Sequence, residues 1–335
     1  MAETVKLKDI AQRMDISVVT VSNALSGKKG VSDSVREEIL AVAEEMGYDL
    51  SKYEKREKEH IKIAVIVSEK YLGIGTSFYW AMYQQVTYAV SRKQGYTMFE
   101  IIPKNVNNRR ELPRVIQEEP IDGIIIIGRV DYKYMERILA AAKVPVVLLD
   151  FYKEGLACDA VLSSNYIGMY KVTRYLLERG HRDIAFVGSR AATENINDRY
   201  YGFRKAMEEW KQPVKPEWIL EDRNIENGDM KAELPEKMPT AFVCSSDLTA
   251  GVIYDKLKSL GYRVPEDISI VGYDNYLYGH PFAQKLTTYN VDMEKMAGTA
   301  VHILLNKIRK KGRRRGVRYI DSGVIERSSV RNLNI

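Results

Sequence analysis

The first apolar stretch of the chain has the periodicity of two short helices joined by a turn. Apolar residues recur at the i, i+3, i+4 and i+7 spacing of an amphipathic helix, and they are Leu7, Ile10, Ala11 and Met14. Residues 15–16 make a tight turn, after which Ser17 can cap a second helix that buries Val21 and Leu25. The pattern therefore predicts a helix-turn-helix over residues 5–25.

A third helix is predicted shortly after the first two. Ser32 or Ser34 can cap it, and Glu37 is spaced for a capping box with Ser34. Its apolar face repeats with helical spacing at Val35, Ile39, Val42, Ala43 and Met46. Gly47 is a suitable stop for this helix. Three helices with one shared apolar centre would form a small module within the first 50 residues.

From residue 61 onward, continuous apolar runs alternate with helical stretches. Such runs indicate strands buried on both faces, and they are residues 61–68, 122–128, 144–150, 183–188, 240–245 and 268–274. The helical stretches between them include residues 81–93, 166–179, 200–210 and 248–260. This alternation predicts a doubly wound α/β fold with parallel sheets. Because about 275 residues exceed one typical sheet domain, two lobes are expected.

The second helix of the N-terminal module turns an unusual set of side chains outward. They are Val18, Val19, Ser22 and Asn23. Exposing two valines costs hydration free energy unless a partner covers them. The second helix of a helix-turn-helix fits the DNA major groove, which would provide that cover. The alternative is a small solvated helical pair that recognises no partner.

Composition narrows the class of protein. The 335 residues are 45% hydrophobic and 29% charged, as in ordinary globular proteins. The N-terminus is polar from Glu3 onward, and no apolar run approaches the ~20 residues that cross a bilayer. Cys158 and Cys244 lie in apolar segments, and neither they nor the four histidines match a metal-ligand spacing. We expect a cytoplasmic protein with reduced core thiols, no membrane segment, no metal and no other cofactor.

The placement of charge is more informative than its sum. The chain carries a net charge of +6, but residues 1–60 hold ten Lys/Arg and twelve Asp/Glu, which makes them −2 and the remaining residues +8. Basic side chains nevertheless surround the two-helix unit, where they can reach phosphates; they are Lys6, Lys8, Arg13, Lys28, Lys29 and Arg36. The basic run at residues 309–315 indicates a solvated turn rather than a second nucleic-acid patch.

No enzymatic motif is supported. Residues 73–78 resemble a dinucleotide-binding fingerprint, but the third glycine is missing and the turn after the strand is not tight. Neither a GxxxxGK phosphate loop nor a GxSxG nucleophile motif occurs, and no Cys/His pair follows a strand. We therefore predict that the chain is not an enzyme.

Several motifs together carry a resemblance to a known family. In the N-terminal module they are residues 6–11, 16–17, 20–22, 25–26, 31–32 and 46–48. In the α/β part they are residues 176–188, 199–203, 244–251, 261–275 and 286–288. Over nearly its whole length the chain resembles the lac-repressor (LacI) family of bacterial transcription regulators. The resemblance implies a DNA-binding headpiece joined to a two-lobed domain like a periplasmic binding protein.

The resemblance also implies domain boundaries. The helix-turn-helix domain would be residues 1–48, a hinge or linker residues 49–60, and the effector-binding domain residues 61–335. Within that domain, one lobe would comprise residues 61–163 and 292–321. The other lobe would comprise residues 164–291 and 322–335.

The linker departs from the pattern of the family. In relatives a hinge helix forms on operator DNA and inserts a leucine between base steps in the minor groove. Here Ser51, Glu54 and Glu57 stand where the usual Asn, Ala and Leu fall. The charge of Glu57 is repelled by the groove and cannot replace base stacking. We predict that this chain binds DNA without intercalation and bends it less than its relatives do.

By the same resemblance, Arg199 and Asp247 are the polar anchors of an effector site between the lobes. A guanidinium supplies fixed donors and a carboxylate supplies acceptors, which together suit vicinal hydroxyls. For each residue the alternative is a purely structural role. Arg199 can form a salt bridge between the lobes, and Asp247 can cap a helix that starts at Leu248.

Aromatic residues favour a carbohydrate as the effector. Phe78, Tyr79 and Trp80 follow the first strand, where the family has a segment that stacks on the ligand. The alternative is that these rings begin a helix and face the core. Lesser ligand candidates are Arg129, Phe151, Asn165 and Asn275. Phe151 stands where relatives often have arginine, and the GYDN setting of Asn275 leaves open a purely structural role.

The predicted mechanism links DNA binding to the effector. Asn23 can pair with adenine, and Val18 and Val19 can contact thymine methyls. Phosphate contacts are expected from Lys6, Ser17, Thr20, Ser22 and Lys28. A homodimer would place two headpieces on a pseudo-palindromic operator. We predict a repressor of carbohydrate-utilisation genes; the alternative, a sugar receptor without a DNA role, would need a signal sequence and no headpiece.

Overall fold

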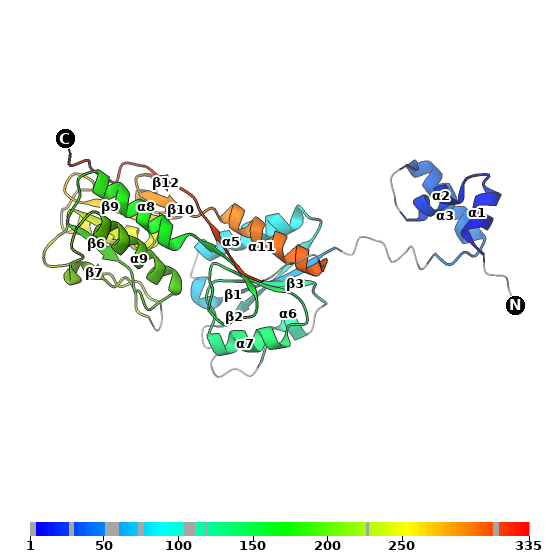
Figure 1. The fold of residues 1–335 in the computed structure, drawn as a ribbon, viewed down its shortest axis with the longest axis horizontal. Helices are drawn as coiled ribbons and strands as arrows, with labels where there is room; N and C mark the ends of the chain where they lie inside the picture. The colour runs from blue at the N-terminus through cyan, green and yellow to red at the C-terminus, as the bar shows by residue number, and fades with distance from the viewer. Residues whose placement is uncertain are drawn as a thin grey trace. The chain divides into compact units, whose positions relative to one another are not determined.

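The computed structural model describes residues 5–26, 30–50, 60–72, 77–103, 111–117, 120–225, 228–310 and 315–334. The chain forms two compact units, Met1–His60 and Ile61–Ile335, whose elements are labelled in Figure 1. Outside the described ranges lie Lys28 and Lys29, the hinge positions Ser51, Glu54 and Glu57, residues 73–76 of the glycine motif and residues 311–314 of the basic run.

The first unit contains the three helices that the hydrophobic pattern predicts. They are α1 (Leu7–Arg13), α2 (Val18–Leu25) and α3 (Asp33–Glu45). Their apolar faces meet in one core, which consists of Ile10, Ala11, Val21, Ala24, Leu25, Ile39 and Ala43. The shared core confirms the predicted three-helix module.

The start of α3 resolves one open alternative and corrects one prediction. Ser32 is the cap, because its Oγ accepts a hydrogen bond from the backbone N–H of Val35 at 3.4 Å. Val35 therefore occupies the third helical position, where a capping box needs its acidic residue. The predicted capping box of Ser34 with Glu37 is wrong, since Glu37 lies beyond the first turn.

The second unit is built on two six-stranded sheets, each the centre of one lobe. The sheet of the first lobe has the strand order β11-β5-β4-β3-β1-β2, and all of its pairs are parallel. Its strands are β1 (Lys62–Ser68), β2 (Tyr96–Ile102), β3 (Gly123–Ile127), β4 (Val146–Leu149), β5 (Asp159–Ser163) and β11 (Val317–Ile320). The sheet of the second lobe has the order β12-β10-β9-β8-β6-β7, in which only β12 is antiparallel to its neighbour. Its strands are β6 (Ile184–Val187), β7 (Ile219–Leu220), β8 (Ala241–Cys244), β9 (Ser269–Asp274), β10 (Thr287–Asn290) and β12 (Val324–Ile325).

Helices cover these sheets. In the first lobe, α5 (Phe78–Ser91) and α11 (Met293–Ile308) pack side by side on one face, and α7 (Tyr132–Ala141) covers the other face, where the short α6 (Arg114–Gln117) also lies (Figure 1). In the second lobe the helices are α8 (Asn165–Glu178), α9 (Glu194–Glu209) and α10 (Asp247–Ser259). Short 3₁₀ turns occur at Glu69–Tyr71, Pro216–Trp218 and Pro281–Gln284.

The chain passes between the lobes after β5, after β10 and after β11. Each passage leaves a strand at its carboxyl end, so the carboxyl ends of both parallel sheets lie at the junction of the lobes. A hydrogen bond of 2.9 Å between Ser163 at the end of β5 and the hydroxyl of Tyr273 in β9 joins the lobes there. In open α/β sheets the carboxyl ends of the strands are where ligands bind.

The predicted α/β fold with parallel sheets is confirmed, although several elements differ in extent. The apolar runs coincide with β1, β3, β4, β6, β8 and β9. The helix predicted to start at residue 200 begins instead at Glu194, because Thr193 caps it through a hydrogen bond of its side chain with the N–H of Ile196. Cys158 and Cys244 are buried and unpaired.

The described residues hold neither a candidate membrane span nor a candidate metal-ion cluster. Among these residues no helix is both long and apolar enough to span a membrane. In the same part of the chain, no group of three or more His, Cys, Asp or Glu side chains is placed to hold a metal ion.

Candidate functional site

The exposed side of α2 carries two valines on a helix whose other side is buried. Val18 and Val19 expose 42% and 67% of their surface, whereas Val21, Ala24 and Leu25 are buried. The helix has this orientation because its buried residues fall on one helical face and pack against α1 and α3. The outward orientation of the valines that the sequence predicts is therefore present.

Polar groups at the start of α2 are hydrogen-bonded within the headpiece. The Oγ of Ser17 accepts from the N–H of Thr20 at 3.0 Å and lies 2.8 Å from the Thr20 hydroxyl. Lys6 is exposed at the start of α1, where its N–H donates to the Asp9 carboxylate at 2.7 Å. Ser22 and Asn23 are half-buried. Asn23 lies one turn after Val19 on the same side of α2 and is partly accessible there, and Lys6 is exposed at the start of α1.

In the second unit, Arg199 of α9 is the centre of a buried polar cluster. It is only 6% exposed. Its Nε donates to the Oδ1 of Asn165 at 2.8 Å, and one terminal nitrogen donates to the carbonyl of Ser245 at 2.6 Å. The same nitrogen is 3.5 Å from the Asp274 carboxylate, and the guanidinium lies over the Tyr273 ring at 3.8 Å from its centroid.

Two carboxylates near Arg199 are held in unusual environments at the ends of strands. Asp150 follows β4, and burial raises its pKa to about 6 against the opposing charge of Arg199. Asp274 ends β9, and burial raises its pKa well above the usual range, again opposed by Arg199. Both carboxyl groups keep a proton up to a higher pH than exposed ones, because desolvation disfavours the charged form.

Two polar atoms of this cluster lack hydrogen-bond partners among the described residues, although they are buried. They are the Oδ1 of Asp150 and the Nδ2 of Asn165. The other oxygen of Asp150 accepts from the Tyr79 hydroxyl at 3.0 Å, and the backbone carbonyl of Asp150 accepts from Asn195 at 2.9 Å. A buried acceptor and a buried donor without partners are each costly unless a ligand or water completes them.

Both carboxylate oxygens of Asp247 form hydrogen bonds within the second lobe. Its two oxygens accept from the Thr288 hydroxyl at 2.6 Å and from the N–H of Tyr276 at 2.7 Å. Burial raises its pKa to about 6, although these two hydrogen bonds oppose the shift. The helix-cap alternative for Asp247 is wrong, because Ser246 caps α10 and Asp247 is already its first residue.

Asn275 is also committed to structural bonds. Its side chain donates to Asn290 at 2.9 Å and accepts from Arg327 at 2.7 Å. Its φ of +55° places it in the left-handed region, which asparagine tolerates better than most residues. The structural interpretation of the GYDN segment is thereby favoured over ligand contact.

A carboxylate that no sequence motif indicated organises the neighbouring loops. Asp222 is fully buried and accepts from the hydroxyls of Ser245 and Thr249 at 2.9 and 2.7 Å. Arg223 donates to both of its oxygens. Burial would raise the pKa of Asp222, but the hydrogen bonds and the charge of Arg223 hold it well below the usual range. Asp222 thus fixes Ser245, whose carbonyl accepts from Arg199.

Aromatic rings from both lobes meet beside this cluster. Phe78 and Tyr79 begin α5, and their ring centroids are 5.3 Å apart. Tyr79 also lies 4.7 Å from Tyr71, and Phe78 contacts Tyr276 of the second lobe edge to face at 6.2 Å. Burial raises the pKa of Tyr71 to about 12, so its hydroxyl is neutral. The rings therefore begin a helix, as one alternative held, and also border the junction of the lobes.

Arg129 and Phe151 are the remaining ligand candidates that the sequence indicates, and they lie in different surroundings. Arg129 crosses between the lobes, since it donates to the Ala192 carbonyl at 2.9 Å and lies 3.8 Å from Glu194. Lys70 makes a second crossing, with its Nζ 3.4 Å from the carbonyl of Ile225. Phe151, by contrast, is buried in the core on the α7 face of the first sheet. Its ring is part of that core packing.

Sequence reasoning missed Asp150, Asp222 and Asp274 as members of the cluster. The signal for two of them was present, because Asp150 and Asp274 directly follow or end continuous apolar runs. Polar residues at that position lie at the carboxyl edge of a parallel sheet, where ligands bind. No comparable signal marks Asp222, which follows the two-residue strand β7.

Comparison with known proteins agrees with this architecture. Residues 6–50 match the family described as bacterial regulatory proteins, lacI family, and residues 173–330 match the periplasmic binding protein-like domain. The HTH-type transcriptional repressor PurR of Vibrio parahaemolyticus serotype O3:K6 is 27% identical over 337 residues, covering 98% of this chain and 99% of that protein. The PurR repressor of Aliivibrio fischeri is 28% identical over 336 residues, covering 97% and 98%.

Solved structures show the same fold. A complex of the transcriptional regulator CelR with cellobiose superposes with a TM-score of 0.67 at 19% identity, covering 97% of this chain and 99% of that one. The lac repressor dimer bound to operator and the anti-inducer ONPF gives 0.66 at 20% identity, covering 98% and 100%. The chain thus combines a helix-turn-helix domain of the lacI family of bacterial regulatory proteins with a two-lobed domain like a periplasmic binding protein.

Proposed function

We propose that the chain is a transcriptional repressor that reads operator DNA through α2 and responds to a small polar effector held between its lobes. The exposure of Val18 and Val19 on a helix that is otherwise packed into the headpiece core carries this proposal. Its relatives are named as repressors, and we propose a regulatory rather than a catalytic role. Such a regulator acts on the chromosome, hence in the cytoplasm.

On DNA, α2 would lie in the major groove. Asn23 would pair with adenine while Val18 and Val19 contact thymine methyls. Lys6 and the hydroxyls of the first turn of α2 would bind phosphates, which position the helix without reading sequence. Ser17 can do so only through a free lone pair, because its oxygen already caps the helix.

We further propose that the protein binds DNA as a homodimer. One solved structure of similar fold is a dimer on its operator. In this chain β2 is an edge strand, and apolar side chains on β2 and α5 are exposed; they are Trp80, Tyr88, Tyr96 and Ile101. An unpaired apolar edge of this kind invites association.

Replacing Asn23 by alanine tests the DNA-reading role. Selection from random duplexes with the wild-type protein should return two related half-sites. Asn23→Ala is expected to weaken binding to that sequence by about 5–150-fold, which corresponds to about 1–3 kcal/mol for one bidentate base contact. Binding to random DNA should change little, because phosphate contacts supply it. Fluorescence anisotropy at fixed salt measures both affinities.

The matched control is Glu38→Ala, an exposed change on α3. It should leave the preference for the selected sequence intact. A selected motif without two half-sites would contradict the dimer. A wild-type protein that prefers no duplex would leave the receptor without a DNA role as the surviving function.

For the effector we propose a neutral sugar or glycoside, bound by the cluster around Arg199. The unsatisfied acceptor of Asp150 and the unsatisfied donor of Asn165 suit one hydroxyl group each. Phe78 and Tyr79 offer rings for stacking. The CelR structure is a cellobiose complex, which supports this ligand class. The genes under control would then serve carbohydrate use.

The effector would act by changing the balance between two arrangements of the lobes. Contacts that cross the junction exist between Arg129 and Ala192 and between Phe78 and Tyr276. A ligand that strengthens or replaces such contacts shifts the equilibrium only by its difference in affinity for the two arrangements. The sign of that shift decides between induction and corepression.

The pH dependence of effector binding tests the role of Asp150. Because its pKa is about 6, its carboxylate is charged at pH 7 and mostly protonated at pH 5. A hydroxyl that donates to Oδ1 needs the charged form, so affinity should be about tenfold lower at pH 5 than at pH 7. Thermal shift against neutral sugars, glycosides and purine bases identifies a ligand, and calorimetry at the two pH values measures its affinity.

The control for this prediction is Asp150→Asn. The amide of this variant does not titrate, so any remaining affinity should be independent of pH between 5 and 7. The pKa of Asp247 is also about 6, and a pH dependence caused by that group would persist in the variant. A variant that keeps the wild-type pH dependence would exclude Asp150 as the responsible group. A response to purine bases alone would replace the sugar by a planar heterocycle stacked on the same rings.

A further inference from the structure

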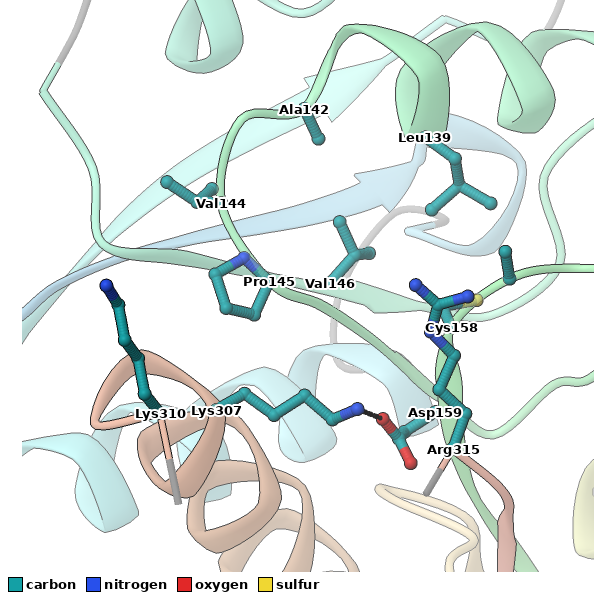
Figure 2. A pocket seen from close by; sticks show the side chains of 11 residues that line it. Leu139, Ala142, Val144, Pro145, Val146, Cys158, Asp159, Lys307, Lys310 and Arg315 are labelled. Carbon is teal, nitrogen blue, oxygen red and sulfur yellow. Dashed lines mark ion pairs between the residues drawn. The ribbon is translucent and has the colours of Figure 1, made fainter. Parts of the chain in front are cut away.

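A cavity lies at the end of the first sheet that is opposite to the junction of the lobes. It has a volume of about 430 Å³, within the range of small-molecule sites. It opens between the start of β4, the start of β5 and the carboxyl ends of α7 and α11, as Figure 2 shows. The four residues of β4 alone separate it from Asp150 by roughly 13 Å, at about 3.3 Å per residue. A ligand here would not occupy the effector site.

The two sides of this cavity differ in chemistry. One side is apolar and consists of Leu139, Ala142, Val144, Pro145 and Val146. The other side is charged and consists of Asp159, Lys307, Lys310 and Arg315. In Figure 2 the side chains of Lys310 and Arg315 stand on either side of the Lys307–Asp159 pair, facing the apolar side. Such a division suits a ligand with a polar head and an apolar body.

The charges on the polar side do not balance internally. Lys307 pairs with the nearly buried Asp159 at 2.6 Å, and the second Asp159 oxygen accepts from the N–H of Gly316 at 3.0 Å. The charge of Asp159 is therefore paired with Lys307 and not with Lys310 or Arg315. Within the described residues, neither of these two cations forms an ion pair with a carboxylate.

The carboxyl ends of α7 and α11 offset only part of the excess positive charge on this side of the cavity. The lining side chains sum to +2, since Lys307, Lys310 and Arg315 face one Asp159. The carboxyl ends of α7 and α11 each contribute about −0.5 elementary charge. The remaining charge is about +1, which favours an anionic over a neutral head group on the ligand.

We propose that this cavity binds a small organic anion with one charged head, either a carboxylate or a phosphate ester. The head would lie beside Arg315, and the hydrocarbon would lie against Leu139, Pro145 and Val146. The cavity is at the amino-terminal edge of the sheet, by which the chain enters the lobe at Lys62 of β1. Such a ligand would be a second input, independent of the effector.

The test uses the full-length protein and four probes in isothermal titration calorimetry. Octanoate and octyl phosphate carry head and chain, octanol lacks the charge, and acetate lacks the chain. One of the two anionic probes should bind at one site per chain, and the tighter of them identifies the head. Octanol and acetate should bind at least tenfold more weakly. Equal affinity for octanol would overturn the proposal, as would the absence of binding by both anionic probes.

Matched variants locate the binding. Arg315→Glu should weaken the anionic probe by about tenfold or more, while Lys285→Glu, the same charge reversal at an exposed lysine of the second lobe, should not. Ala142→Phe fills the apolar side and should abolish binding, while Ala140→Phe, at an exposed position of α7 that does not line the cavity, should not. Unchanged affinity in both Arg315→Glu and Ala142→Phe would place the anion elsewhere and refute the site.

Discussion

Replacing Arg199 by methionine is expected to lower the free energy of unfolding of the second unit by about 3–5 kcal/mol at pH 7.5, the range for breaking a buried ion pair. The substitution leaves Asp274, whose side chain is 13% exposed, without its cation. It also removes the donors to Asn165 and to the carbonyl of Ser245. The methionine side chain fills most of the volume, so the loss reports the charge rather than a cavity.

The loss should be smaller at pH 5 than at pH 7.5. Burial already raises the pKa of Asp274, and Arg199 is the group that opposes this shift. In the folded variant, Asp274 keeps its proton at pH values at which the same group is ionised in the unfolded chain. This window runs from the ordinary carboxylate pKa up to the raised pKa of Asp274. The stability of the variant therefore falls as the pH rises through that window, and more steeply than the stability of the wild type.

Urea denaturation of both proteins at the two pH values measures this difference. The second variant is Arg199→Met combined with Asp274→Asn, which removes the unpaired charge. The double variant should recover much of the stability at pH 7.5 and show little additional dependence on pH. An equal loss at both pH values, or no recovery in the double variant, would mean that Arg199 acts through packing and not through its charge.

The sequence predicts those parts of the fold in which periodicity and burial coincide. The headpiece could be derived because Ile10, Val21 and Ile39 fall on helical faces that become its core. Strands β1, β3, β4, β6, β8 and β9 could be derived because they are continuous apolar runs. The inner strand β5 was missed because polar residues flank its three apolar positions on both sides. Strand β2 was missed because it lies at a sheet edge and is half-exposed, and β10 because it is buried through its threonines. Thr287 and Thr288 satisfy their hydroxyls with side-chain and backbone partners, and no apolar run marks such a strand.

The candidate site could be predicted only in part for a related reason. The family motif identifies Arg199, and the structure places it at the centre of the buried cluster. The motif does not say which carboxylates face Arg199, because Asp150 and Asp274 come from strands of different lobes. The same limit applies to Asp247, whose two oxygens accept from Thr288 and Tyr276. Partners across a lobe junction depend on the packing of two sheets, which no local pattern records.

Replacing Ile10 by alanine is expected to abolish operator binding while leaving the second unit intact. Ile10 is fully buried in the headpiece core, and truncating such a residue costs about 2–5 kcal/mol. A module of this size has a total stability of only about 2–7 kcal/mol, at roughly 0.05–0.15 kcal/mol per residue. The headpiece of Ile10→Ala should therefore be largely unfolded, since no disulfide supports its small core.

The comparison with Val19→Ala separates folding from recognition. Val19 is 67% exposed, so its truncation should leave the helical circular dichroism and the melting of the headpiece unchanged and still weaken binding to the selected operator severalfold. Ile10→Ala should lose both the headpiece signal and operator affinity by at least a hundredfold, with effector affinity as in the wild type. Operator affinity within threefold of wild type in Ile10→Ala would show that DNA binding does not depend on the three-helix core. Weakened effector binding in that variant would show that the two units do not fold independently.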